Sequence, residues 1–144
     1  MLKGKNYLRL GGILSSFVAI FQAIISFFPS WSLYFGAPEE LVSNSLLLII
    51  SGVVVAIIFL IFGLYGFSGA GDIRHLPLLR IVLLGIASIY TLRGSLIILQ
   101  ILILLSFVES GEVVTLQLIL SSIVSLIIGI IYFLGIKKNW HNLK

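Results

Sequence analysis

The chain has 144 residues, of which 60% are hydrophobic and 10% charged, with a formal net charge of +4 and no cysteine. Soluble domains contain about 45–50% apolar and about 25% charged residues, so a water-soluble fold of this size is excluded because it could not bury so much apolar surface. The lack of cysteine excludes disulfides, thiolate nucleophiles and cysteine-ligated metals. We expect no cofactor, no metal and no nucleic-acid partner, and no enzymatic activity.

Four apolar segments are each long enough to cross a bilayer. They run from about residue 8 to 28, about 45 to 65, about 78 to 107 and about 116 to 136, and each has the roughly 20 apolar residues that a span of about 30 Å requires. Their length and continuity favour helices over the short alternating strands of a barrel. Pro29 is predicted to end the first helix, the glycine-rich segment 66–71 to end the second, and Pro38 to begin a short interfacial helix. The sequence thus predicts an all-α membrane protein, a single domain over residues 1–144, built as an antiparallel bundle of four transmembrane helices.

Charged residues divide between the two sides of this predicted bundle. The basic residues outside the spans fall before the first segment, between the second and third, and after the fourth: Lys3, Lys5, Arg9, Arg74, Arg80, Lys137, Lys138 and Lys144. The other two loops carry only acids: Glu39, Glu40, Glu109 and Glu112. Lys and Arg are retained on the cytoplasmic side. We therefore expect both termini in the cytoplasm, in the inner (plasma) membrane of a bacterium.

Small residues recur along three of the segments. They are Gly12, Ser16, Ala19, Ala23 and Ser26 on the first, Gly52, Ala56, Gly63 and Gly66 on the second, and Ser121, Ser125 and Gly129 on the fourth. Small residues let helices approach closely in lipid. Two interpretations stay open, packing within one chain or contact between copies through the Ser121–Gly129 stripe. The expected partners are membrane lipids, with a homo-oligomer or a larger membrane complex as further partners.

Arg93 is the main candidate for a functional site. It lies near the middle of the third segment, where a translocon-based scale assigns an arginine a cost of roughly 3 kcal/mol, and none of the four segments contains an Asp or Glu. Tyr90 and Gln100 fall on the same helical face, and Gln22 of the first segment is a candidate neighbour. We predict a buried arginine that serves as counter-charge for a carboxylate, a phosphate or a lipid head group. The alternative is a structural role, in which Arg93 extends to the membrane interface or bonds to Gln22 and to backbone carbonyls.

The loop at residues 68–77 is a second candidate site. Its glycines leave backbone N–H groups free to bind an anion, and Arg74 and Arg80 would attract anionic lipid head groups. The alternative is a turn whose charges only obey the positive-inside rule.

Three resemblances bear on function. The size is similar to that of small multidrug-resistance exporters and of membrane-bound glutathione transferases, but the first group needs a glutamate where this chain offers Gln22, and the second needs an Arg, Asn and Glu motif that residues 45–65 lack. Residues 66–71, 76–80 and 90–94 together resemble small four-helix inner-membrane proteins of bacteria with no assigned function. Our leading hypothesis is a protein that binds, and helps to move, a lipid or amphipathic anion. The second is a structural or assembly subunit of a membrane complex.

Overall fold

The computed structural model describes residues 4–34, 38–105 and 116–143, and within these ranges all regular structure is helical. The elements are α1 (Gly4–Ser26), α2 (Pro29–Tyr34), α3 (Glu39–Val42), α4 (Ser45–Ala70), α5 (Leu79–Leu105), α6 (Leu116–Asn139) and a final turn of 3-10 helix (Trp140–Asn142). In the described ranges, 4 helices are long and apolar enough to cross a membrane, namely α1, α4, α5 and α6. This confirms the prediction of an all-α fold with four helices of membrane-spanning length.

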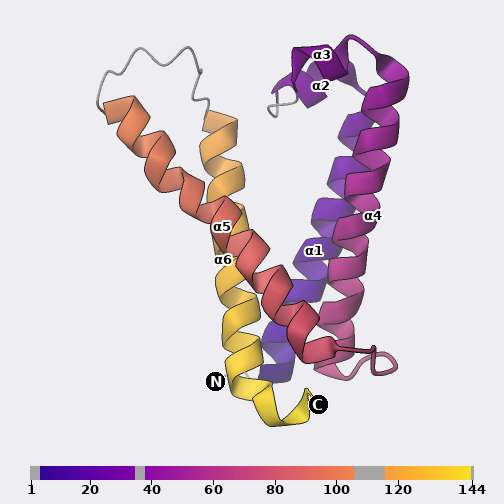
Figure 1. Ribbon diagram of the computed structural model, residues 1–144, viewed down its shortest axis with the longest axis vertical. Helices are drawn as coiled ribbons and strands as arrows, with labels where there is room; N and C mark the ends of the chain where they lie inside the picture. Colours follow the sequence, from indigo (N-terminus) through magenta and orange to yellow (C-terminus); the bar gives the residue numbers. More distant parts are fainter. Residues whose placement is uncertain (1–3, 35–37, 106–115, 144) are drawn as a thin grey trace.

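The long helices form two hairpins that diverge (Figure 1). α1 and α4 lie side by side in one hairpin, and α5 and α6 form the other. The hairpins meet at the end that holds both chain termini, which we call the closed end, and separate toward the opposite end, which we call the open end. The short helices α2 and α3 lie at the open end, above the α1–α4 hairpin.

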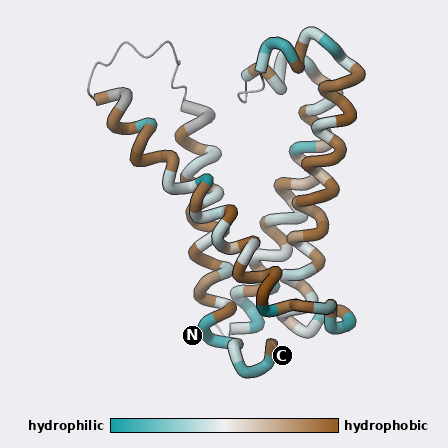
Figure 2. The backbone as a smooth tube through the Cα atoms, viewed as in Figure 1, coloured by the Kyte–Doolittle hydropathy of each residue, from teal (hydrophilic) through white to brown (hydrophobic). Residues whose placement is uncertain are grey.

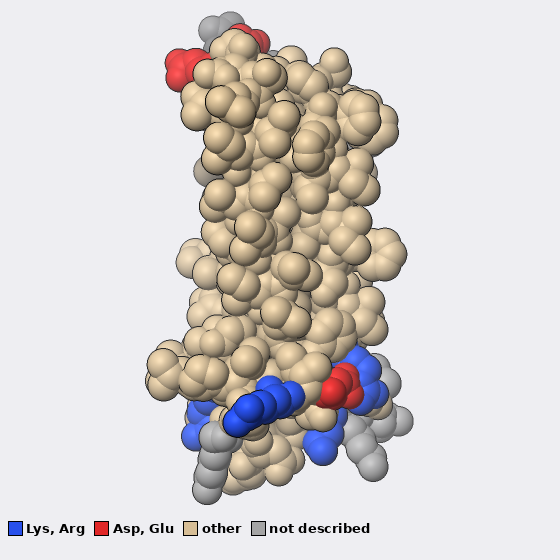
Figure 3. All heavy atoms as spheres, turned by 90° about the vertical axis from the view of Figure 1, so that its right-hand side faces the viewer, with Lys and Arg blue, Asp and Glu red and all other residues tan. Residues whose placement is uncertain are grey.

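The long helices consist mostly of hydrophobic residues along their length (Figure 2). Large side chains such as Phe17, Leu92 and Leu46 are 71%, 70% and 67% exposed, as expected for groups that face lipid. Lys and Arg side chains gather near the closed end, and acidic side chains mark the open end (Figure 3). Asp72, the only acid at the closed end among the described residues, receives hydrogen bonds from both Arg9 nitrogens Nε and Nη2, the first at 2.7 Å. The hydrogen bonds from Arg9 hold the pKa of this carboxyl below its ordinary value.

α1 and α4 pack through the small residues that the sequence singled out. A Cβ built on Gly66 would lie 2.8 Å from the Cα and N atoms of Gly12, and one built on Gly63 would lie 2.6 Å from Ser16 Oγ. The two backbones are therefore in direct contact. For these two stripes, the interpretation as packing within one chain is confirmed.

The glycine-rich segment does not end α4 where the sequence predicted. The helix continues to Ala70 because Gly66 and Gly69 pack against other helices instead of forming a turn. Gly71 ends it, with a φ of +83° and hydrogen bonds from Gly71 N to Ser68 O and from Asp72 N to Phe67 O. This is the Schellman arrangement, in which glycine relieves the strain of a left-handed residue.

The first helix ends before Pro29, as predicted, and Pro29 also begins α2, since proline is suited to the first turn of a helix. One other predicted boundary was wrong. The last helix reaches Asn139, beyond the predicted end near residue 136, because the Asn139 side chain is buried and donates to the Gly69 carbonyl at 3.0 Å. The predicted short helix after Pro38 is present as α3.

Candidate functional site

A hydroxyl cluster joins the two hairpins in the middle of the molecule. Ser15 Oγ of α1 lies 2.9 Å from the Tyr90 hydroxyl of α5 and 3.0 Å from the Tyr132 hydroxyl of α6. The Tyr132 hydroxyl also lies 3.0 Å from the Phe62 carbonyl of α4. All three hydroxyl-bearing residues are buried. Each of the four long helices thus contributes one group to a hydrogen-bonded network.

Aromatic rings surround this cluster. Tyr90 stacks on Tyr132 with ring centroids 6.0 Å apart and on Phe59 at the same distance, and Phe62 meets Tyr90 edge-on at 5.9 Å. Toward the closed end the core is continuous and apolar, and includes Leu8 and Leu83 at 0% exposure. The two hairpins are therefore sealed together from the cluster to the closed end.

On the other side of the cluster lies a cavity of about 820 Å³ between the hairpins. The lining residues nearest the cluster are Val18 on α1, Phe59 on α4, Tyr90 on α5 and Ile128 on α6. The other lining residues of these helices lie further toward the open end, so the cavity is on the open-end side of the cluster. Residues Ser32, Tyr34, Pro38 and Leu41, from α2, α3 and the segment before α3, line its outer part. The cavity has a floor at the hydroxyl cluster and mostly apolar walls, and residues of α2 and α3 line it on the open-end side.

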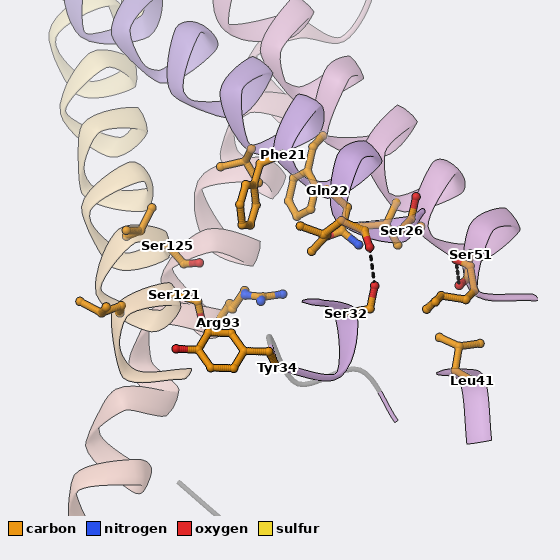
Figure 4. A pocket seen from close by; sticks show the side chains of 18 of the residues that line it. Phe21, Gln22, Ser26, Ser32, Tyr34, Leu41, Ser51, Arg93, Ser121 and Ser125 are labelled. Carbon is orange, nitrogen blue, oxygen red and sulfur yellow. Dashed lines mark hydrogen bonds between the residues drawn. The ribbon is translucent and has the colours of Figure 1, made fainter. Parts of the chain in front are cut away.

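Arg93 projects into this cavity, one helical turn beyond Tyr90 (Figure 4). Its side chain is exposed, so the prediction of a buried arginine was wrong. The sequence located the residue near the middle of a long helix but could not reveal that the hairpins diverge at that level. Among the described residues, the only ion pair between charged side chains is Arg9–Asp72, so Arg93 has no carboxylate partner there.

Two further polar side chains in the cavity have unused hydrogen-bonding capacity. Gln22 of α1 and Ser125 of α6 make no hydrogen bond within the described part of the chain, and both point toward the space beside Arg93 (Figure 4). Three serines in the same lining differ, because their hydroxyls donate to backbone carbonyls: Ser26 to Ala23, Ser32 to Ile25 and Ser51 to Leu48. Arg93, Gln22 and Ser125 therefore form a set of donors, one from each of three helices, in an apolar enclosure.

Tyr34 of α2 also lines the cavity (Figure 4). Tyr34 is a site residue that the sequence does not predict. In the sequence, Tyr34 is one of several aromatic residues expected at a membrane interface, and this position alone does not distinguish it from the others.

The other predicted site residues lie elsewhere. The structure brings Arg93, Tyr90 and Gln22 to one cavity, whereas Gln100 is not part of its lining and accepts a hydrogen bond from Ser122 Oγ at 3.1 Å. Arg80 is at the closed end, where its guanidinium lies 4.1 Å from the Trp140 ring centre and donates to the Trp140 carbonyl at 2.7 Å. Arg74 is exposed in the loop between α4 and α5.

The predicted Ser121–Gly129 stripe serves two purposes. Ser121 and Ser125 line the cavity, whereas a Cβ on Gly129 would lie 2.6 Å from Thr91 Oγ1, so this glycine packs α6 against α5. Gly94 has the same role, since its Cβ would lie 2.5 Å from the Leu126 backbone.

The fold and composition together are those of an integral membrane protein. Comparison of the chain with protein-family models, with curated proteins and with solved structures finds no match. The site itself therefore carries the functional argument.

Proposed function

We propose that this protein binds a lipid or another amphipathic anion in the cavity between its hairpins, with Arg93 as the counter-charge. In this proposal the closed end faces the cytoplasm of a bacterium, both termini lie on that side, and the cavity opens toward the opposite side. The gathering of Lys and Arg at the closed end supports this orientation (Figure 3).

The observation that carries the proposal is the set of donors around Arg93. The guanidinium lies in an apolar cavity beside the Gln22 amide and the Ser125 hydroxyl, without a carboxylate among the described residues. Polar groups at membrane depth are costly unless they are solvated or paired. An anion would pair with all three groups, and its apolar part would cover walls such as Val55 and Val124.

A second candidate function is that of an assembly subunit in a membrane complex. The same unpaired Arg93 beside an opening between two hairpins would fit an apolar helix of a partner protein that carries a carboxylate at the matching depth. A ligand of small mass and a partner chain differ in size, so one measurement separates the two functions.

Native mass spectrometry of the protein, extracted in mild detergent, tests this proposal. We expect the wild-type protein to retain an anionic amphiphile and the Arg93→Gln variant to lose it. Ser51→Ala is the matched control, because Ser51 lines the same cavity but its hydroxyl is bonded within its own helix. Retention that is equal in wild type and Arg93→Gln would refute the proposal, and a retained protein chain that Arg93→Gln releases would favour the assembly subunit.

A further inference from the structure

We infer that the cavity selects an amphiphile whose head is an oxyanion with no attached ammonium group, a carboxylate or a phosphate monoester, and binds it head first. This inference rests on the proposed function, which requires only that some amphipathic anion binds at Arg93. It adds the chemical class of the head group and the orientation of the bound molecule.

The hydrogen-bonding groups of the cavity determine the head. A guanidinium offers a planar fork of N–H donors that matches two oxygens of one oxyanion. Gln22 adds amide N–H donors and Ser125 a hydroxyl, whereas the hydroxyl protons of Ser26 and Ser51 are used within their own helices. The available donors therefore complement several oxygens gathered on one atom.

The cavity also lacks a feature that a zwitterionic head would need. Among the described residues, the lining contains no Asp or Glu, so none of them would offer a carboxylate to an ammonium group next to the bound oxyanion. It would also be held near the positive charge of Arg93, in a medium that screens poorly. Selection against such heads follows from repulsion as much as from attraction to the oxyanion.

The Tyr90 ring, at the floor of the cavity, does not offset this deficit. Aromatic faces can bind ammonium groups by cation–π contact. The Tyr90 ring, which is nearest to Arg93 along α5, is stacked against both Phe59 and Tyr132, at centroid distances of 6.0 Å and interplanar angles of 26° and 10°. Its ring is thus occupied by other rings, and it closes the floor of the cavity.

The position of the floor sets the orientation. Arg93 lies one turn beyond Tyr90, near the floor, whereas Leu48, Leu41 and Pro38 line the cavity toward the open end. A head bound at Arg93 would have no room behind it, so its chain must extend along the apolar wall toward the open end. A volume of about 820 Å³ is within the roughly 300–1,000 Å³ of pockets that enclose drug-sized molecules.

Four probes that share one alkyl chain test this inference: hexadecanoate, hexadecyl phosphate, hexadecylphosphocholine and hexadecyltrimethylammonium. Each is titrated, below its micellar concentration, against the delipidated full-length protein in phosphatidylcholine nanodiscs, with binding followed by calorimetry. We expect the first two to bind at least tenfold more tightly than the last two. Arg93→Gln should abolish the difference, whereas Ser51→Ala should leave it intact. Acetate and inorganic phosphate, at the same concentrations, should not bind measurably.

The contrary outcomes separate the inference from the proposed function. Equal affinity for hexadecylphosphocholine and hexadecyl phosphate, both lowered by Arg93→Gln, would overturn the head-group selection but retain a lipid site at Arg93. Binding of acetate or phosphate as tight as that of the chain-bearing probes would overturn the amphiphile class. Affinities of all four probes that are unchanged in Arg93→Gln would overturn the proposed function as well.

Discussion

Substituting Ser125 by Leu tests the cavity directly. The Ser125 hydroxyl makes no hydrogen bond among the described residues, and Ser125 lines the cavity although it is only 7% exposed, so we expect a leucine side chain to extend into the cavity. Leucine is also the better helix former, by less than about 0.7 kcal/mol. We therefore expect the free energy of unfolding in detergent to change by less than about 1 kcal/mol, where overpacking of a filled interface would cost about 1–3 kcal/mol.

Binding should respond differently from stability. Loss of one hydroxyl donor removes about 0.5–1.5 kcal/mol of binding free energy. The leucine side chain also occupies space that the ligand needs. We expect the dissociation constant for hexadecanoate to rise at least about tenfold, which corresponds to about 1.4 kcal/mol. Calorimetric titration and thermal unfolding, measured on the same preparation, report the two effects separately.

Gly129→Ala is the matched control, one turn further along the same stripe. Its new Cβ would lie 2.6 Å from Thr91 Oγ1 and 2.9 Å from Thr91 N, and the second atom belongs to a helix backbone that cannot move freely. We expect the free energy of unfolding of this variant to fall by about 1–2 kcal/mol, since overpacking outweighs the gain of about 1 kcal/mol in helix propensity. If Ser125→Leu is destabilised as strongly as Gly129→Ala, residue 125 is in a filled interface and the argument for the cavity fails.

Three further predictions concern the fold and the orientation. Gly66→Ala should lower the free energy of unfolding by about 1–3 kcal/mol, because the new methyl group separates α1 from α4. In the same thermal unfolding assay, Gly85→Ala should be neutral or stabilising, because its Cβ meets nothing within 4 Å. Ser15→Ala should cost about 1–3 kcal/mol of unfolding free energy because it leaves the buried Tyr90 hydroxyl without a partner; an unchanged stability would argue against the cluster as a junction of the hairpins. Reporter fusions at the C-terminus should report a cytoplasmic location, and fusions within residues 106–115, which lie outside the described residues, the opposite side; a reversed pattern would contradict the orientation.

Packing along α1 and α4 was predictable because it depends on local composition. A stripe of glycine and serine at helical spacing must meet another helix closely, whichever helix that is. The same reasoning failed for the end of α4, since Gly66 and Gly69 serve close packing and only Gly71 has the positive φ of a helix end. Glycines for a turn and glycines for a contact look alike in a sequence, and only the neighbouring helix distinguishes them.

The candidate site was predictable in part for a similar reason. Arg93 and Tyr90 share a helical face, which the period of the helix dictates, and an arginine in an apolar segment is notable in any sequence. That Ser125 is available to a ligand while Ser51 is bonded within its own helix depends on side-chain rotamers and on which hydroxyl faces open space. The sequence also placed Gln100 with this site, although Gln100 is bonded to Ser122 outside the described cavity lining. It predicted a second site with Arg74 and Arg80, although Arg80 is engaged by Trp140 at the closed end.

By itself, the sequence determined that this protein has four helices long and apolar enough to cross a membrane, and that eight of its nine basic residues, all except Arg93, lie outside their centres. These properties follow from the transfer of side chains from water to hydrocarbon, which depends on each residue and its near neighbours alone. The tertiary structure decided that the helices pair as two hairpins, that a cluster around Ser15 joins them halfway, and that they diverge beyond it so that Arg93 faces a cavity. The angle between packed helices is set by side chains far apart in the chain, such as Gly94 against Leu126, and such pairings are absent from the local pattern of any one segment.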